Sequence, residues 1–211
     1  MADNKTDIIL NAAEELMCAS SDPTGITVDM IARKAGIGKG SIYYYFKSKE
    51  EITDAVIERC YTLGIREYFE SIREGGSTLD KIKMLFQSML REEFRDSSKN
   101  ILLSLHLRDD IIVHQKLMMT AIKTLSPILC KLLEEGRSDG SIHTDTPRES
   151  SEMIVAMLTF LLDNTIFPSD NESMQRKLKL YSQVLETCLR SEKGSFDFLY
   201  TPFDGLGIVR Q

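Results

Sequence analysis

Residues 26–49 have the sequence ITVDMIARKAGIGKGSIYYYFKSK, which predicts two short helices joined by a glycine turn. Thr27 is a favourable N-cap for the first helix. Gly36 stands where a residue in the left-handed conformation would end that helix. Ile37 and Ile42 can then anchor the second helix on the first, with Phe46 closing the small core. One face of the first helix carries apolar residues at helical spacing, namely Val28, Ile31, Ala32 and Ala35. This arrangement is typical of a helix-turn-helix.

The charge of this stretch differs from that of the whole chain. The 211 residues carry a formal net charge of -6, whereas residues 26–49 hold five basic side chains and one acid, Asp29, for a net charge of +4. A positive segment on an acidic protein favours contact with DNA phosphates through that segment. Helix-turn-helix pairs also occur as purely structural corners, and a run of tyrosines can belong to a core. The glycines and lysines around the second helix favour DNA binding, with that helix in the major groove.

The run from Thr27 to Ile52 resembles the DNA-binding signature of TetR-family transcriptional regulators. In this signature a Thr opens the second helix and an Ala-Gly turn follows. Then come a Lys-Gly-Ser/Thr-aliphatic-Tyr-Tyr-x-Phe segment and a Lys-Ser-Lys-Glu-Glu-aliphatic start of the fourth helix. The detailed resemblance covers Asn4 to about Val56, and the remainder agrees only in length and helical pattern.

The resemblance implies an all-α protein of about nine helices. Residues 1–48 would form an N-terminal three-helix DNA-binding domain that contains the helix-turn-helix. Residues 49–193 would form a larger helical domain for effector binding and dimerisation, and residues 194–211 a C-terminal tail that packs back or stays mobile. Such a regulator would bind double-stranded DNA at a palindromic operator, as a homodimer that pairs through its last two helices.

The resemblance also assigns roles within the DNA-binding segment. Lys39 and Gly40 begin the recognition helix and would contribute base readout. The remaining candidates would mainly position phosphates, Lys49 from the N-terminus of the fourth helix; they are Thr27, Ser41, Tyr43, Tyr44, Tyr45 and Lys49. The alternative is that one of the three tyrosines, with Tyr44 as the first choice, serves the small core.

Helix-start signals recur along the rest of the chain. Ser48 and Ser169 are each followed three residues later by Glu, which predicts a capping box at both positions. Thr146 stands before a proline, a typical N-cap followed by proline at the first helical position. Pro127 falls inside a predicted helix over residues 114–135, where it would act as a kink or a restart point.

The last two predicted helices differ in how their apolar residues are distributed. Met153–Leu162 is apolar nearly all round and must be covered on two sides, whereas Leu178–Leu189 offers one apolar stripe. A second copy of the chain is the preferred cover, with an interface of roughly 2,000 Å² or more. The alternative is that the tail Phe196–Phe203 folds over this surface within one protomer.

A small-molecule effector is a further expectation for the larger domain. Because no basic cluster marks a phosphate, the effector would be apolar or amphipathic and of moderate size, with His106 and Asn164 as hydrogen-bonding anchors. The alternative is a filled core without a cavity. The candidate lining residues come from different helices: Phe86, Met89, Leu90, Leu103, His106, Leu107, Met118, Phe160 and Asn164.

Other constellations do not point to chemistry. The three histidines lack metal-ligand spacing, and no HExxH, GxSxG, P-loop or dinucleotide-binding glycine pattern is present. We therefore expect no enzyme activity, no cofactor and no metal. The cysteines are far apart and form no CxxC pair, which favours reduced core thiols over a redox sensor. They are Cys18, Cys60, Cys130 and Cys188.

The sequence also bears on location and on the overall function. No apolar run reaches the roughly 18 residues that span a bilayer, and the first residues lack a secretory pattern. We expect a cytoplasmic regulator without membrane contact, a repressor released from its operator by the effector. One alternative is a DNA-binding regulator or architectural protein without a small-molecule effector. Another is a helical enzyme or lipid-binding module with a vestigial helix-turn-helix.

Overall fold

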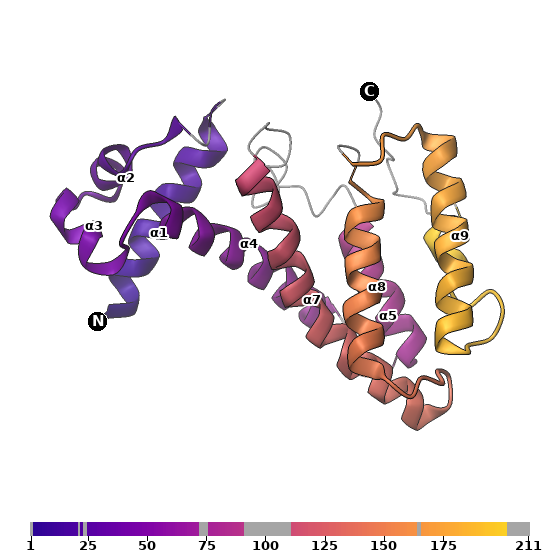
Figure 1. Ribbon diagram of the computed structural model, residues 1–211. Coiled ribbons are helices and arrows are strands. Elements are labelled where there is room, and N and C mark those ends of the chain that lie inside the picture. Colours follow the sequence, from indigo (N-terminus) through magenta and orange to yellow (C-terminus); the bar gives the residue numbers. More distant parts are fainter. Residues whose placement is uncertain are drawn as a thin grey trace. The chain divides into compact units, whose positions relative to one another are not determined.

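The computed structural model describes residues 2–20, 22, 25–71, 76–90, 111–163 and 166–201. These residues form eight α-helices and one short 3-10 helix, and no strand occurs among them (Figure 1). The prediction of an all-α protein is therefore confirmed. The elements are α1 Ala2–Ala19, α2 Val28–Ala35, α3 Lys39–Tyr45, α4 Lys49–Ser71, α5 Thr78–Leu90, α7 Ile111–Asp139, α8 Pro147–Leu161, α9 Asn171–Leu189 and η3 Asp197–Leu199.

The described residues fall into two compact units. The first takes in those of Met1–Leu63 and Arg95–Thr120, and the second takes in those of Gly64–Phe94 and Ala121–Gln211. Helices α4 and α7 each contribute residues to both units. The domain boundary expected after residue 48 lies inside the first unit, and it stays a prediction.

The core of the first unit explains why this unit extends beyond the helix-turn-helix. Ile9 from α1, Ile31 from α2 and Ile42 from α3 are fully buried. Ile52 from the first turn of α4 and Leu117 from α7 belong to the same apolar cluster. Burial of these side chains supplies the main stabilising term, so the first turns of α4 are part of this core rather than of a separate one.

Local capping at the start of α4 follows the predicted box. The Ser48 hydroxyl oxygen accepts the backbone N–H of Glu51 at 3.2 Å. The Glu51 carboxylate turns back and accepts the backbone N–H of Lys47. Both orphan donors are thus satisfied near the start of the helix, which begins at Lys49 as expected.

The caps of α8 and α9 differ in detail from the predictions. Thr146 occupies the N-cap position, but its side chain makes no capping bond. At α9 the cap is Asp170 rather than Ser169, and its carboxylate accepts the backbone N–H of Ser173 at 2.7 Å. A carboxylate accepts more strongly than a hydroxyl, so the start moves by one residue. Pro127 lies inside one helix, α7, so it is not a restart point.

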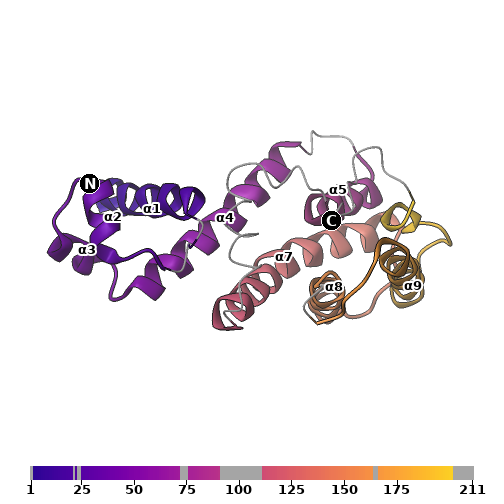
Figure 2. The ribbon, with the colours of Figure 1, turned by 90° about the horizontal axis from the view of Figure 1, so that it is seen from above.

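Helices α8 and α9 pack side by side in the second unit (Figures 1 and 2). Ile154, Val155 and Leu158 form the buried side of α8. Tyr181 of α9 is buried, and its hydroxyl donates to the backbone carbonyl of Ile154 at 2.7 Å. Burial raises the pKa of Tyr181 above its usual range, so it remains a neutral donor.

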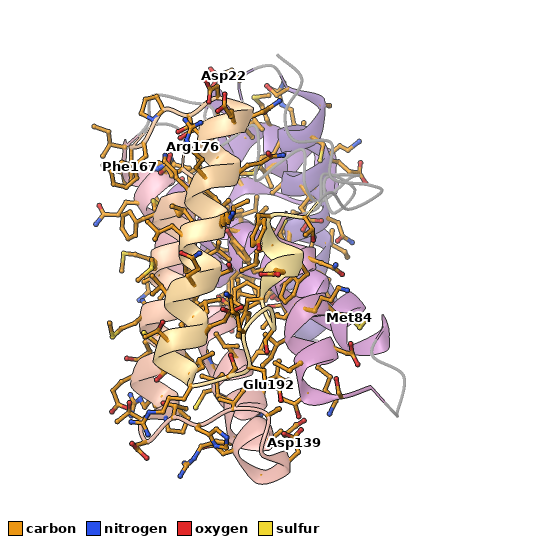
Figure 3. The ribbon with its side chains drawn as sticks, turned by 90° about the vertical axis from the view of Figure 1, so that its right-hand side faces the viewer. Asp22, Met84, Asp139, Phe167, Arg176 and Glu192 are labelled. Atoms are coloured by element: carbon orange, nitrogen blue, oxygen red, sulfur yellow. The ribbon has the colours of Figure 1, made fainter. Side chains whose placement is uncertain are left out.

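The described part of the C-terminal tail packs back onto the second unit. Phe196 and Leu199 are both 0% exposed. The ring of Phe198 lies 6.3 Å from that of Phe86 on α5. In Figure 3 the short yellow η3 lies between α9 and α5, the helix that carries the labelled Met84, and η3 contacts both helices. The tail therefore extends the core between α5 and α9. It leaves Met153 on α8 65% exposed.

Candidate DNA-binding surface

The turn between α2 and α3 holds these helices as the sequence predicts. The Thr27 hydroxyl oxygen accepts the backbone N–H of Met30 at 3.3 Å, which caps α2. Gly36 adopts φ 66° and ψ 27°, a left-handed conformation that a side chain would strain. The backbone N–H of Ile37 then donates to the carbonyl of Ala32 at 3.1 Å, which closes the C-terminal turn of α2.

Helix α3 buries Ile42, partly buries Tyr45 and exposes its other residues. Ile42 is fully buried, whereas Tyr44 is 85% exposed and Tyr43 is also exposed. Tyr45 is half-buried and packs against the apolar cluster of the first unit. The structure thus rejects the alternative that Tyr44 serves the core, because Tyr45 takes that place. The exposed residues of the helix are Lys39, Gly40, Ser41, Tyr43 and Tyr44.

Gly40 faces open space. A Cβ atom added there would meet no atom within 4 Å, and its backbone is helical. Glycine costs about 1 kcal/mol relative to alanine in a helix. The fold itself therefore does not require glycine at this position. A bare backbone here leaves room for a close approach by an external partner, which fits the expected contact with DNA.

An ion pair crosses the turn and was not predicted. The Nζ atom of Lys39 lies 2.7 Å from the Oδ2 atom of Asp29, in the first turn of α2. The hydrogen bond and the negative charge of Asp29 raise the pKa of Lys39. A second pair joins Lys34 to Glu15 of α1, also at 2.7 Å. Lys34 and Lys39 of this basic segment are therefore both paired with carboxylates. Sequence spacing alone offers no signal for contacts that depend on the angle between helices.

The structure distributes the expected effector residues unevenly. Phe86 and Met118 are buried, but Phe86 belongs to the second unit and Met118 to the first. Phe160 is 43% exposed, so its expected inward orientation is wrong. The inward positions of α8 are taken by the residues around Leu158, and Phe160 lies on the other side of the helix. The other expected side chains lie outside the described residues: Met89, Leu90, Leu103, His106, Leu107 and Asn164.

The cysteines are less buried than expected. Cys60 is buried, and burial raises the pKa of its thiol to about 12. Cys18 and Cys188 are exposed, so the prediction of core thiols is wrong for these two. The pKa values of Cys18 and Cys130 are also raised, mainly by desolvation. A raised pKa lowers the thiolate fraction and disfavours a redox sensor at these three positions.

Two absences can be stated for the described part of the chain. It contains no group of three or more His, Cys, Asp or Glu side chains that could hold a metal ion. None of its helices is long and apolar enough to cross a membrane.

Two family models match the chain. A model described as "Bacterial regulatory proteins, tetR family" matches residues 9–56, which contain the capped turn and α3. A model described as "Tetracyclin repressor-like, C-terminal domain" matches residues 97–184. The two matches do not overlap, and together they cover most of the chain.

Individual proteins show the same similarity. The chain is 25% identical over 154 residues to the HTH-type transcriptional repressor NemR of Escherichia coli (strain K12), covering 70% of this chain and 77% of the relative. It is 28% identical over 134 residues to the Fatty acid metabolism regulator protein of Bacillus subtilis (strain 168), covering 64% and 69%. The structure of RolR in complex with its ligand resorcinol aligns with a TM-score of 0.65 at 16% identity, covering 97% of each chain. At that identity the likeness shows the fold.

Proposed function

The chain belongs to the TetR family of bacterial regulatory proteins, and from this premise we propose that it is a ligand-responsive repressor that binds a palindromic operator. The exposed face of α3 carries the proposal. Lys39 and Gly40 read base edges, because a long cation and a bare backbone stand at the start of this helix. Phosphates are positioned by Thr27, Ser41, Tyr43, Tyr44, Tyr45 and Lys49.

Dimerisation through α8 and α9 is part of this proposal. Met153, Met157 and Phe160 follow one another at helical spacing and are exposed on α8. Leu180 of α9 is exposed as well. A second copy of the chain would bury this apolar stripe, and two protomers would present two recognition helices to the two half-sites of a palindrome. The described tail contacts α5 and α9 and leaves the stripe on α8 uncovered, which supports the dimer over an intrachain cover.

An apolar or amphipathic effector is the regulatory part of the proposal. The effector binds in the second unit, with Phe86 in its lining, and shifts the protein toward a state that binds the operator less tightly. RolR shares the fold, and its solved structure is a complex with the ligand resorcinol, a small neutral phenol. The protein acts in the cytoplasm, where chromosomal DNA is accessible.

The experiment starts from a pool of random DNA duplexes selected on the purified protein. We expect an enriched palindrome, and fluorescence anisotropy on that palindrome should show weaker binding by the variants Lys39→Ala and Tyr44→Ala. Lys131→Ala on α7 is the control, because this exposed lysine lies in the second unit. Enrichment without a palindrome, or equal binding by all variants, contradicts the proposed operator recognition.

A second stage of the experiment distinguishes the proposed repressor from the rival function, a DNA-binding protein without an effector. Small uncharged aromatic compounds, resorcinol among them, are titrated into the protein–operator complex. Release of the operator by at least one compound supports the repressor. The complex formed by the control variant Lys131→Ala should release the operator at the same concentration of that compound. An operator complex that no compound dissociates favours the architectural protein.

Replacing Asp29 by Asn is expected to strengthen binding to DNA of any sequence by about two- to fivefold, the value of an exposed ion pair. The change releases the Lys39 ammonium for phosphate or base contact and removes a carboxylate beside the DNA. Glu15→Gln is the matched control, because it breaks the Lys34 pair of equal length and changes the net charge equally. Anisotropy at several salt concentrations measures both. An equal gain in DNA affinity for the two variants would show that the change in net charge, and not the release of Lys39, explains the stronger binding.

Replacing Lys49 by Ala is expected to weaken binding to all sequences and to reduce the salt slope by about one ion. Lys49 is the first residue of α4, behind the Ser48 cap, where a cation and backbone N–H groups favour an anion. The measurement is the logarithm of the binding constant against the logarithm of salt concentration. An unchanged slope removes Lys49 from the phosphate contacts.

A further inference from the structure

Asp29 and Lys39 place an acid and a base side by side on the exposed surface of the helix-turn-helix. Lys39 is the first residue of α3, and Asp29 lies in the first turn of α2, which packs against α3 (Figure 1). The Nζ atom of Lys39 lies 2.7 Å from the Oδ2 atom of Asp29, and the two side chains are 49% and 57% exposed. An ion pair with this exposure adds little to the stability of a fold. Both charges stay within reach of an external partner, beside the open position at Gly40.

The pair keeps hydrogen-bonding capacity for such a partner. An ammonium has three N–H donors and a carboxylate has about four acceptor sites. The bond between Lys39 and Asp29 uses one of each. This bond and the charge of Asp29 raise the pKa of Lys39, so the ammonium stays charged at neutral pH. The pair therefore offers a donor and an acceptor that lie next to each other at a fixed distance.

The edge of a G·C base pair in the major groove has the complementary pattern. Guanine presents two neighbouring acceptors, N7 and O6, and the N4 amino group of cytosine is a donor. The guanine O6 and cytosine N4 atoms share a Watson–Crick hydrogen bond, so they lie roughly 2.9 Å apart. This spacing is close to the 2.7 Å between the Lys39 ammonium and the Asp29 carboxylate. An ammonium opposite guanine O6 thus brings the carboxylate opposite cytosine N4.

An A·T base pair fits the two charges less well. Its one major-groove donor, adenine N6, lies between two acceptors, adenine N7 and thymine O4, and the thymine methyl group follows. A carboxylate opposite adenine N6 would therefore stand beside an acceptor that repels it. The DNA phosphates also repel Asp29, whatever the sequence. The amino group of cytosine is the group on DNA that suits this carboxylate best.

We propose that Asp29 determines operator specificity together with Lys39, and that the two side chains read one G·C base pair in each half-site. Lys39 donates to the guanine O6 and N7 atoms, and Asp29 accepts from the N4 amino group of the paired cytosine. This inference rests on the proposed function, which places the start of α3 in the major groove. It adds the base pair that is read and a residue of α2 that takes part in reading it.

The first step of the test locates the base pair. Each G·C pair of the palindrome selected on the purified protein is exchanged for A·T, and fluorescence anisotropy measures the affinity. We expect one position in each half-site at which the exchange weakens binding by wild type at least about fivefold, the lower end for one base contact. Lys39→Ala should be nearly indifferent to the exchange at this position, because it lacks the ammonium that contacts guanine.

The second step tests Asp29 with one modified base. N4-methylcytosine still pairs with guanine, but its methyl group replaces the amino hydrogen that faces the major groove. We expect wild type to bind the duplex with this base at least about fivefold more weakly than the unmodified duplex. Asp29→Ala should bind both duplexes within about twofold, because it has no acceptor for that hydrogen. Alanine is chosen over asparagine, since an asparagine oxygen could still accept from N4.

Glu15→Ala is the matched control. It removes the carboxylate of the Lys34 pair, which has the same length, and changes the net charge equally. This variant should keep the wild-type preference for the unmodified duplex. Each comparison is a ratio of two affinities for one variant, so changes in net charge or in the fraction of folded protein cancel.

The outcomes separate this inference from the proposed function. Equal binding of the two duplexes by wild type, or a preference that persists in Asp29→Ala, overturns the role of Asp29. A palindrome without a G·C position that depends on Lys39 overturns the base pair as well. In these cases the repressor stands, because its operator is still selected and released by an effector. If no palindrome is selected, the proposed function fails and this inference fails with it.

Discussion

Replacing Phe160 by Glu is expected to convert the proposed dimer into monomers at micromolar concentration and to weaken binding to the proposed operator by about 10²–10⁴-fold. Phe160 is exposed on α8 with Met153 and Met157, and a charge placed in an apolar interface cannot be solvated there. The loss of operator affinity follows because two linked half-site contacts become two independent ones. Sedimentation velocity gives the oligomeric state, and anisotropy with full and half operators gives the affinity.

Met119→Glu is the matched control for this change. Met119 is exposed to a similar extent on α7 and belongs to the first unit, whereas the stripe on α8 belongs to the second. It should leave the dimer intact and keep binding to the full operator near the wild-type value. A dimer that persists in Phe160→Glu would place the interface elsewhere, and a monomeric wild type with unchanged half-site binding would refute dimerisation itself.

Replacing Phe196 by Ala is expected to lower the free energy of unfolding by about 3–5 kcal/mol, the range for a fully buried phenylalanine. Its ring is 0% exposed and lies 6.0 Å from that of Phe198, which in turn contacts Phe86. The loss combines the lost burial of apolar surface with a cavity between α5 and α9. Chemical unfolding followed by circular dichroism measures it.

Phe198→Ala offers the graded comparison, because this ring is only half-buried. It should cost clearly less than Phe196→Ala. Equal and negligible losses in the free energy of unfolding for both variants would show that the C-terminal segment is not part of the core in solution.

The helix-turn-helix could be predicted in detail because its determinants are local. Thr27 caps α2 through a bond to a residue three positions later, and Gly36 takes a backbone conformation that glycine adopts without strain. The capping box at Ser48 also acts within one helical turn. The exposure of Lys39 and Gly40 then follows from the burial of Ile42, because a short helix has one inward face.

The candidate effector site could be predicted much less well. Phe160 was expected to face inward because α8 is apolar nearly all round, and such a helix gives no periodic signal for its buried side. The burial of Gln87 was not predicted either, because a polar residue in an amphipathic helix is ordinarily assigned to solvent.

The amino-acid sequence by itself determined the helical class, the capped turn before α3 and the residues that this helix presents, since each depends on contacts within a few positions of the chain. Only the tertiary structure decided that Asp29 pairs with Lys39, that Tyr45 rather than Tyr44 supports the core, and that Phe160 faces outward. These features depend on the angles and registers at which helices pack, and many residues distant in the chain determine those jointly.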